Sequence, residues 1–462
     1  MGEVAQARLR AFSIGFGGLQ TWSVAAQFAI NWNWPDEVIK PLASIIRRRN
    51  EAALETLAPE SMVTLLTIRF DGSIEPREPV HIKDIKGRLF RVYPGDVVFS
   101  KIDVRNGAIG LAPDDIECMC VTSEFPVYSV DFQKTDSGYV KLLFRTVAFK
   151  RLLNSMISGA SGRKRIQPTQ LEGVKVPIPA LPIQQKIVAH WEAALTKAND
   201  LLAQADQLPG KLENQVLGEL GLKKKKRKTM PKVMVTNWAE LTKWNQRSTY
   251  LLGQAPDLGK GIYPVVNGRE CIAEVKHGCS ASPSSKPTTL KVLKLSAVTS
   301  GHFLPSEAKF IADKKQFREN FDLIKGDILM CRTNGTLAYV GRPAILEKDY
   351  PELIFPDKLM RVRCKANILP EYLEYILSSS IARPQLEANA RTAVGNHAIG
   401  NEDVFNVELP LPPISVQNIL IKIVQEARSD IQHAKGEALS LQRNAEQEIE
   451  KMILGTRPVE VH

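Results

Sequence analysis

Cysteine is scarce in this chain of 462 residues, and none of its six cysteines stands at the spacing that metal sites use. No Cys-x2-Cys is followed by a second such pair or by a His-x3-5-His. This excludes the common zinc sites, and unpaired cysteines are typical of a reduced, cytosolic protein. Long hydrophobic runs are also missing, because no stretch reaches the roughly 18 apolar residues that a membrane span needs. We therefore expect a cytoplasmic protein without a membrane partner.

The motifs that support catalysis are absent as well. The chain has no Gly-x4-Gly-Lys-Ser/Thr phosphate loop, and it lacks the glycine-rich cofactor loop and Asn/Asp-Pro-Pro-Tyr/Phe motif of a methyltransferase. The acidic residues near Pro94 and Pro356 lack the Asp/Glu-x-Lys partner of a nuclease site, and the seven histidines form no metal-binding pattern. We predict that the chain is not an enzyme by itself, with no catalytic residue, metal or cofactor of its own.

What the chain does contain is a long internal repeat. Residues 95–101 (Gly-Asp-Val-Val-Phe-Ser-Lys) return about half a chain length later as residues 326–332 (Gly-Asp-Ile-Leu-Met-Cys-Arg). In the same way, residues 174–179 (Val-Lys-Val-Pro-Ile-Pro) return as residues 407–412 (Val-Glu-Leu-Pro-Leu-Pro). A repeat of this length is too long for a solenoid unit, so each copy should hold a domain and a connector. We expect such a chain to bind a partner that is itself bipartite.

Each copy ends in a heptad pattern, which begins beside Gln185 in the first copy and beside its match Gln417 in the second. Apolar residues recur every seven positions in two rows per segment: Ile187, Ala194, Leu201 and Leu208 with Trp191, Ala198, Ala205 and Leu212, then Leu420, Ala427, Ala434 and Leu441 with Val424, Ile431, Ala438, Ala445 and Met452. Such seams are typical of coiled coils, and the many alanines favour close helix approach. The simplest partner for each seam is the other one, and a pseudo-two-fold repeat makes the pair antiparallel. The alternative is that each amphipathic helix packs only on its own domain.

The segments before the seams have the pattern of strands. Residues 63–70 are followed by Asp71-Gly72, a hairpin signal. Residues 89–93 and 96–101 flank the turn Pro94-Gly95. A helical stretch is predicted around residues 139–158, before a loop rich in Gly, Ser and basic residues. Residues 209 and 210 (Pro-Gly) are expected to interrupt the first long helix near its end.

The net charge of +11 indicates an acidic or nucleic-acid partner, although six consecutive basic residues at 223–228 supply more than half of it. That run is typical of a solvated linker, of an electrostatic anchor on DNA or of a nuclear localisation patch. Lys and Arg bind phosphates, whereas sequence is recognised by side chains such as Arg, Asn and Gln at base edges. The candidate DNA contacts in mixed polar loops are Lys101, Arg105, Asn106, Arg163, Lys164 and Arg165 in the first copy, and Lys276, His277, Ser280, Arg332, Asn334, Arg391, Asn396 and His397 in the second. The alternative is that these loops are simply solvated.

In their order and duplication, these motifs resemble the DNA specificity (S) subunits of type I restriction–modification systems. The matching segments are residues 94–102, 107–110, 123–127 and 208–214, residues 273–282 and 293–296, and both proline-rich helix entrances. Each motif alone is weak, but the ordered set covers nearly the whole chain.

The resemblance implies an α+β fold with two β-rich target recognition domains, separated by two long antiparallel coiled-coil helices in a pseudo-two-fold repeat. The expected boundaries are 1–182 for the first recognition domain, 183–222 for the first spacer helix, 223–231 for a basic linker, 232–413 for the second recognition domain, 414–455 for the second spacer helix and 456–462 for the tail. Helices of about 35 residues are roughly 50 Å long.

The resemblance also implies a function. Each recognition domain would bind one half of a bipartite site on double-stranded DNA, and the helix pair would set the gap and dock two modification (methyltransferase) subunits. S-adenosylmethionine, ATP and Mg would then belong to the modification and restriction (translocase and nuclease) subunits. The alternatives are a helical adaptor that does not itself recognise DNA, and a single-chain restriction enzyme, which would need the missing motifs.

Overall fold

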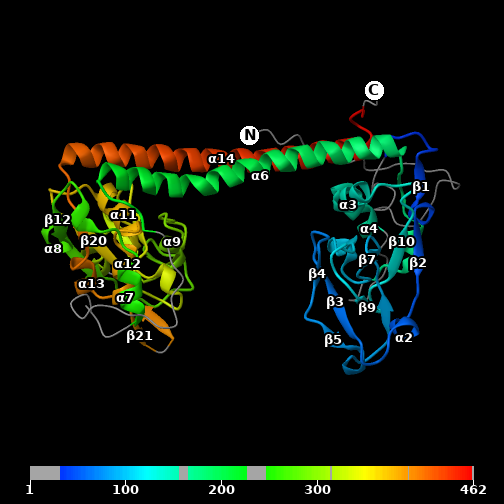
Figure 1. Cartoon of the computed structure of the whole chain (residues 1–462), viewed down its shortest axis with the longest axis horizontal. Coiled ribbons are helices and arrows are strands. Elements are labelled where there is room, and N and C mark those ends of the chain that lie inside the picture. Colours follow the sequence, from blue (N-terminus) through cyan, green and yellow to red (C-terminus); the bar gives the residue numbers. More distant parts are fainter. Residues whose placement is uncertain (1–31, 156–164, 226–245, 313–314, 394, 460–462) are drawn as a thin grey trace. The chain divides into compact units, whose positions relative to one another are not determined.

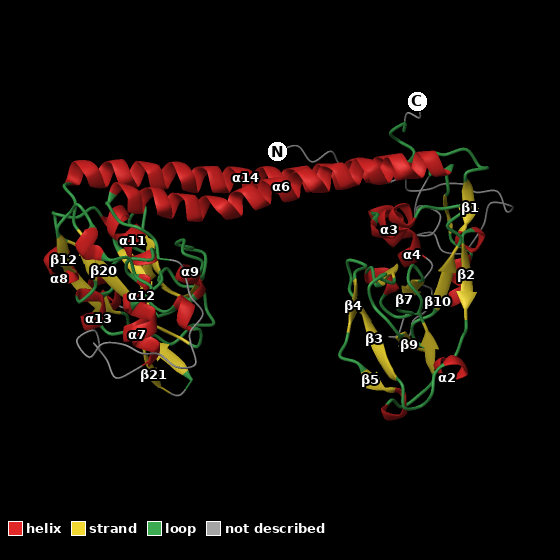
Figure 2. Cartoon of the chain, viewed as in Figure 1, coloured by secondary structure: helices red, strands yellow, loops and turns green. Residues whose placement is uncertain are grey.

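A computed structural model describes residues 32–155, 165–225, 246–312, 315–393 and 395–459 (Figures 1 and 2). The chain divides into two compact units. Unit 1 combines the residues up to Leu201 with those from Gly436 onwards, and unit 2 runs from Leu202 to Lys435. Within the described ranges, no helix is both long and apolar enough to cross a membrane.

Unit 1 contains two sheets and a separate strand pair. Its strands are β1 (Ile39–Pro41), β2 (Ile46–Arg49), β3 (Met62–Ile68), β4 (Ile74–Pro76), β5 (Val80–His81), β6 (Leu89–Arg91), β7 (Val97–Phe99), β8 (Ile109–Leu111), β9 (Met119–Thr122), β10 (Val127–Val130) and β11 (Lys175–Pro177). Its short helices are α2 (Ala53–Thr56), α3 (Ser137–Arg145), α4 (Val147–Ser155) and α5 (Pro168–Glu172), with 3-10 turns η2 (Leu42–Ser44), η3 (Ile82–Asp84) and η4 (Val104–Asn106). The central sheet has the order β2–β10–β7–β8, the second sheet has the order β4–β3–β9–β6 with β5 also on β3, and β1 pairs with β11.

Strand β7, predicted from residues 96–101, lies between two of the buried apolar clusters of unit 1. Val97 and Phe99 belong to the apolar cluster that contains α3 and α4, whereas Val98 belongs to the cluster that contains Met119 and Val121 of β9. This division follows from the alternation of side chains along a strand. Because all three β7 side chains are fully buried, the chain that leaves the strand starts from a fixed position.

Unit 2 repeats this plan and adds one small sheet. Its strands are β12 (Val265–Asn267), β13 (Ile272–His277), β14 (Lys291–Leu293), β15 (Ala308–Phe310), β16 (Ile328–Cys331), β17 (Thr333–Asn334), β18 (Pro343–Ile345), β19 (Leu353–Ile354), β20 (Leu359–Cys364), β21 (Arg391–Ala393), β22 (Asn396–Ala398) and β23 (Glu408–Pro410). Its short helices are α7 (Gln246–Leu252), α8 (Gly268–Cys271), α9 (Ser296–Thr299), α10 (Lys315–Asn320), α11 (Pro370–Ser378), α12 (Arg383–Asn389) and α13 (Asn401–Phe405), with 3-10 turns η6 (Leu258–Lys260) and η7 (Leu337–Tyr339). The sheet orders are β13–β20–β16–β18, β15–β14–β19, β17–β22–β21 and the pair β12–β23. The four-stranded sheet and the strand pair therefore occur in both units.

The repeat extends to individual hydrogen bonds at the start of each long helix. Gln184 is fully buried, and its Nε2 donates to the carbonyls of Lys134 at 3.2 Å and Pro179 at 2.7 Å. Gln417 is equally buried and donates to the carbonyls of Asn367 at 3.2 Å and Pro412 at 2.9 Å. Gln184 is therefore the counterpart of Gln417. The sequence alignment of Gln417 with Gln185 is wrong by one residue, because Gln185 is exposed and does not make these buried hydrogen bonds.

The long helices are α6 (Leu181–Glu219) and α14 (Ile414–Leu454), and each passes from one unit into the other. In unit 1, His190 Nε2 of α6 lies 2.7 Å from Glu448 Oε2 of α14. In unit 2, late α6 and early α14 share one buried apolar cluster that contains Val216 and Val424. Early α6 thus meets late α14, and late α6 meets early α14. The predicted antiparallel helix pair is confirmed.

Burial along the two helices follows the heptads. Every seam position predicted from the sequence is buried or half-buried, including Ile187, Trp191, Leu201, Leu208, Ile431 and Leu441. Ala198, Ala205, Ala438 and Ala445 are at most 3% exposed, although their sequence neighbours on both sides face solvent. Small side chains at these positions allow the two backbones to approach closely, as the alanine-rich pattern indicates.

Pro209 lies inside α6 and does not interrupt it, contrary to the expectation from the sequence. A proline within a helix removes one backbone hydrogen bond and crowds the preceding turn. The ring of Pro209 is exposed, while Leu212, Val216 and Leu220 beyond it are buried in the main core of unit 2. Burial of this apolar face offsets the local cost and continues the helix to Glu219.

The glycine motif at residues 107–110 permits close backbone packing in unit 1. A Cβ on Gly107, whose φ is +106°, would lie 2.0 Å from the carbonyl oxygen of Phe70. A Cβ on Gly110 would lie 2.1 Å from the carbonyl oxygen of Gly72. Only glycine fits both positions, so this motif holds the β3–β4 turn against β8.

Candidate nucleic-acid interface

In unit 2, candidate DNA contacts that follow β13 and β16 lie at the same end of the sheet β13–β20–β16–β18. Strand β20 runs antiparallel to β13 and β16, and Met360 near its start pairs with His277 on one side and Met330 on the other. The C-terminal ends of β13 and β16 therefore lie beside the start of β20. Arg332, just after β16, donates its backbone N–H to the carbonyl of Lys358 at 2.8 Å. His277 and Arg332, far apart in sequence, are thus brought together.

Other predicted residues at this end are partly held by the protein itself. The Nζ of Lys276 lies 5.7 Å from the ring centroid of Phe321, and Nη1 of Arg332 donates to the carbonyl of Asp357 at 3.1 Å. Ser280 is exposed in the segment that leaves β13. Lys276 and Arg332 are therefore oriented by neighbours yet remain half-exposed.

The small sheet β17–β22–β21 assembles the remaining candidates of unit 2. Asn334 pairs with His397 across β17 and β22, and Thr392 of β21 pairs with His397 from the other side. Thr392 Oγ1 lies 3.1 Å from His397 Nδ1, while the side chains of Arg391 and Asn396 are exposed. Guanidinium, amide and imidazole groups of this kind form hydrogen bonds with phosphates and base edges. The β21–β22 hairpin, residues 391–393 and 395–398, can make such contacts.

The same position of unit 1 holds a different set of polar residues. The Lys101 carbonyl accepts the N–H of Ile166 at 2.9 Å, as the Arg332 carbonyl accepts the N–H of Ile399 at 3.1 Å. Lys101 Nζ donates to the carbonyl of Ser123 at 2.6 Å. The repeat therefore places Lys101 where unit 2 has Arg332.

The other candidates of unit 1 are only partly described. Arg165 forms an ion pair with Glu124 at 3.3 Å. Arg105 and Asn106 are the last two residues of η4. Asn106 is exposed, and its Nδ2 donates a weak hydrogen bond to Asp103 at 3.5 Å. Arg163 and Lys164, the sequence counterparts of Asn396 and His397, lie outside the described residues.

Three polar atoms beside Arg332 are buried without a hydrogen-bond partner in the described residues: His277 Nε2, Arg332 Nε and Asn401 Oδ1. Asn401 Nδ2 donates to the carbonyl of Val275 at 3.0 Å, which fixes its amide next to β13. The side chains of His277 and Asn401 interact with each other, so the protein itself holds this polar group together. Asn401 and Thr392 were missed in the sequence because neither belongs to a basic cluster.

Burial lowers the pKa of His277 below its usual 6.5, and the nearby Arg332 guanidinium lowers it further, against a smaller opposing effect of Asn401. Folding thus favours the neutral imidazole, and the unfolded chain takes up the proton first as the pH falls. We expect the free energy of unfolding to be highest above about pH 6.5 and to decrease as the pH falls through the lowered pKa.

A His277→Asn variant should lose this part of the pH dependence, measured by urea unfolding at a series of pH values. His302→Asn is the control, because that histidine is exposed in the same unit. Identical pH profiles for the wild type and His277→Asn would contradict the assignment.

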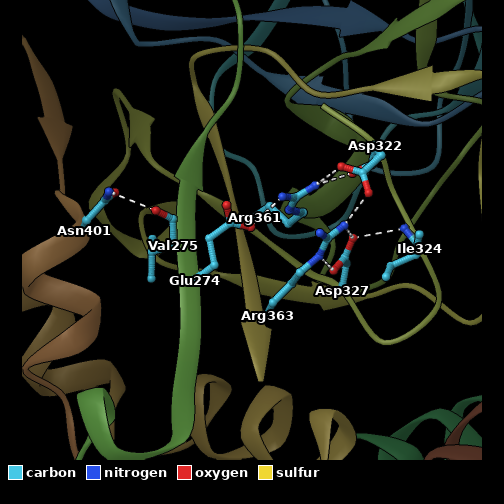
Figure 3. A network of polar contacts seen from close by, with 8 residues as sticks. All are labelled: Glu274, Val275, Asp322, Ile324, Asp327, Arg361, Arg363 and Asn401. Carbon is cyan, nitrogen blue, oxygen red and sulfur yellow. Dashed lines mark hydrogen bonds and ion pairs between the residues drawn. The ribbon is translucent and has the colours of Figure 1, made fainter. Parts of the chain in front are cut away.

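A network of ion pairs beneath this end of unit 2 holds the strands together (Figure 3). Arg361 on β20 donates to Glu274 Oε2 on β13 at 2.5 Å and to Asp322 Oδ1 at 2.7 Å. Arg363 bridges Asp322 and Asp327, each at 2.7 Å. Burial opposes ionisation of Asp322, but the hydrogen bonds from Arg363 and Arg361 outweigh it and lower its pKa. The network thereby fixes the register of β13 against β20 and the position of Lys276.

The described residues contain no group of three or more His, Cys, Asp and Glu side chains that could hold a metal ion. The buried cysteines are not activated nucleophiles, since burial raises the thiol pKa of Cys120, Cys271 and Cys331 to about 11. The polar groups described above are hydrogen-bond donors and acceptors that can orient a ligand.

The sequence of this chain is similar to that of known proteins. Residues 94–207 match the family described as type I restriction modification DNA specificity domain. The chain is 27% identical over 291 residues to the type I restriction enzyme EcoKI specificity subunit of Escherichia coli strain K12, and 26% identical over 294 residues to the StySPI specificity subunit of Salmonella potsdam. Each match covers 63% of this chain and 58% of the relative.

A solved structure supports the fold. One chain from work on the structural basis of complex assembly and conformational transition of the type I R-M system aligns with a TM-score of 0.56 at 17% identity. That alignment covers 90% of this chain and 97% of the other. The predicted fold class, two β-rich domains with a pair of long helices, is confirmed.

Proposed function

We propose that this chain is the DNA-binding specificity subunit of a type I restriction–modification complex. The premise is that residues 94–207 match the type I restriction modification DNA specificity domain. The resemblance found in the sequence is confirmed by this match and by the two relatives named as specificity subunits. In the proposed function, each unit binds one half of a bipartite site on double-stranded DNA.

One observation carries this proposal: the same scaffold occurs twice in one chain, with different polar side chains at the equivalent position. Lys101 and Arg332 occupy matching places and make matching backbone hydrogen bonds to Ile166 and Ile399. The following segments differ, since unit 2 has Asn396 where the sequence repeat has Arg163 in unit 1. Common scaffolds with different reading groups suit two half-sites of different sequence, because base edges are distinguished by the side chains that meet them.

We also infer how labour is divided within the complex. In this proposal the chain supplies binding and positioning, and the catalytic residues, metal and cofactors belong to the partner subunits. Two modification subunits would dock on the helix pair, carry S-adenosylmethionine and methylate the DNA, while restriction subunits would use ATP and Mg. The helix pair would set the gap between the two half-sites. Chemistry on the partners and recognition on this chain agree with the lack of catalytic motifs.

Exchange of the first recognition domain tests the proposal. A hybrid that takes residues 1–180 from another specificity subunit should change one half of the methylated site and leave the other half as it was. Methylation sequencing of host DNA gives both halves at once. The matched control exchanges only residues 223–228 for neutral residues and should leave both halves unchanged. A hybrid that alters both halves or neither would contradict the division, and loss of all DNA binding by the chain would favour the helical adaptor.

A further inference from the structure

The edge strand β2 of unit 1 carries a run of three arginines, Arg47, Arg48 and Arg49, that belongs to none of the sequence motifs. Arg47, Arg48 and the following Asn50 are exposed, whereas Arg49 is half-buried. Across the described ranges, the guanidinium groups of Arg47 and Arg48 make no ion pair or hydrogen bond. Two exposed positive charges thus occupy consecutive positions of an edge strand, and their side chains leave opposite faces of the sheet, Arg47 beside Ser129 and Arg48 beside Tyr128.

The nearby carboxylates are already engaged. Arg49 donates Nε and Nη2 to the two oxygens of buried Asp96 at 3.0 and 3.2 Å, and its guanidinium lies 4.6 Å from the centroid of the Tyr93 ring. Glu51 accepts the Tyr93 hydroxyl at 2.7 Å. These contacts hold the end of β2 in place and leave Arg47 and Arg48 without a partner.

Strand register places this segment at the candidate interface. Val127 of β10 pairs with Arg49 on one side and with Val98 on the other, so the C-terminal ends of β2 and β7 lie at the same end of the sheet. Lys101 follows β7 at this end, and Arg165 forms its ion pair with Glu124 there.

The register also identifies the counterpart of this segment in unit 2. Val98 matches Leu329 in the repeated motif, and Leu329 pairs with Arg361, which pairs in turn with Lys276. The same path in unit 1 leads through Val127 to Arg49. Arg49 and Asn50 therefore occupy the places of Lys276 and His277, a match that the sequence does not reveal.

We propose that residues 47–50 form a nucleic-acid contact of unit 1, in which Arg47 and Arg48 bind backbone phosphates. This inference rests on the proposed function and extends it to a strand outside the predicted loops. Guanidinium groups match the geometry of phosphate oxygens and keep their charge at any working pH. Phosphate contacts position a protein on DNA without selecting a sequence, so these arginines support affinity and not the choice of bases.

The test compares the full-length wild type with an R47A/R48A variant on a duplex of random sequence. Each lost phosphate contact lowers the slope of log Kd against log salt by about one unit, so the double variant should lose about two units. The matched control, K86A/K175A, removes two exposed charges from other surfaces of unit 1 and should keep the wild-type slope. R47K/R48K retains both charges and should restore most of the slope. Circular dichroism melting checks that all variants fold.

An R47A/R48A slope equal to that of K86A/K175A overturns this inference. The proposed function survives that result if the variant still discriminates both half-sites. A wild type whose binding to random-sequence DNA does not depend on salt overturns both. Loss of half-site discrimination in R47A/R48A at an unchanged slope would mean that the arginines select bases, and it would overturn their assignment to phosphates.

Discussion

An R391A/N396A/H397A variant should lose discrimination at one half of the DNA site and keep it at the other. The three side chains lie on the β21–β22 hairpin, where Arg391 and Asn396 are exposed and His397 is held by Thr392. A good bidentate contact with a base is worth about 1–3 kcal/mol, so the affinity for the matched site should fall roughly a hundredfold or more. Binding is measured on two duplexes, each with one half-site replaced.

The control for the hairpin variant is Lys309→Ala, which removes an exposed charge from β15 in the second sheet of the same unit. It should bind both duplexes as the wild type does. If the triple variant still distinguishes both half-sites, the hairpin is only a solvated surface. If it loses discrimination at both, the two units do not act on separate halves.

Arg361→Ala should destabilise unit 2 by about 3 kcal/mol, because it breaks a buried ion-pair network and leaves Glu274 without its partner, while Asp322 keeps Arg363. The Arg361 side chain is 2% exposed, whereas Glu274 and Asp322 are about 40% exposed and can be partly rehydrated. We therefore expect a loss near the lower end of the range for buried pairs. The effect is measured by unfolding in urea, with the resistance of unit 2 to proteolysis as the readout.

Arg269→Ala is the matched control, because Arg269 pairs with Glu402 on the surface of the same unit and both side chains are more than half exposed. Exposed pairs of this kind contribute less than about 1 kcal/mol. Equal stability of the two variants would show that the network around Arg361 adds little. A selective loss in Arg361→Ala should also weaken DNA binding, because the network orients Lys276.

The corresponding position in unit 1 is the hydrophobic Val127, buried in the core around Val98. One scaffold therefore tolerates either a buried arginine with its carboxylates or a valine among apolar neighbours. Fully paired ionic networks and apolar packing are alternative solutions for such a site. No local pattern in residues 359–364 distinguishes an exposed arginine on a strand from a buried one, so the sequence did not identify this network.

The sequence by itself determined the duplicated plan, the β-rich character of both units and the antiparallel helix pair. These properties are encoded locally, by glycine turns, by strand-length runs and by heptads such as Ala198–Ala205 whose period is that of the helix. Tertiary structure alone decided which residues meet. It continued α6 through Pro209, and it showed that Gln184, not Gln185, makes the buried contacts at the start of this helix. It also showed that Arg49 holds in unit 1 the position that Lys276 holds in unit 2. The physical reason is that strand register and burial depend on neighbours far away in the chain, so a shift of one residue moves a side chain from the core to the surface.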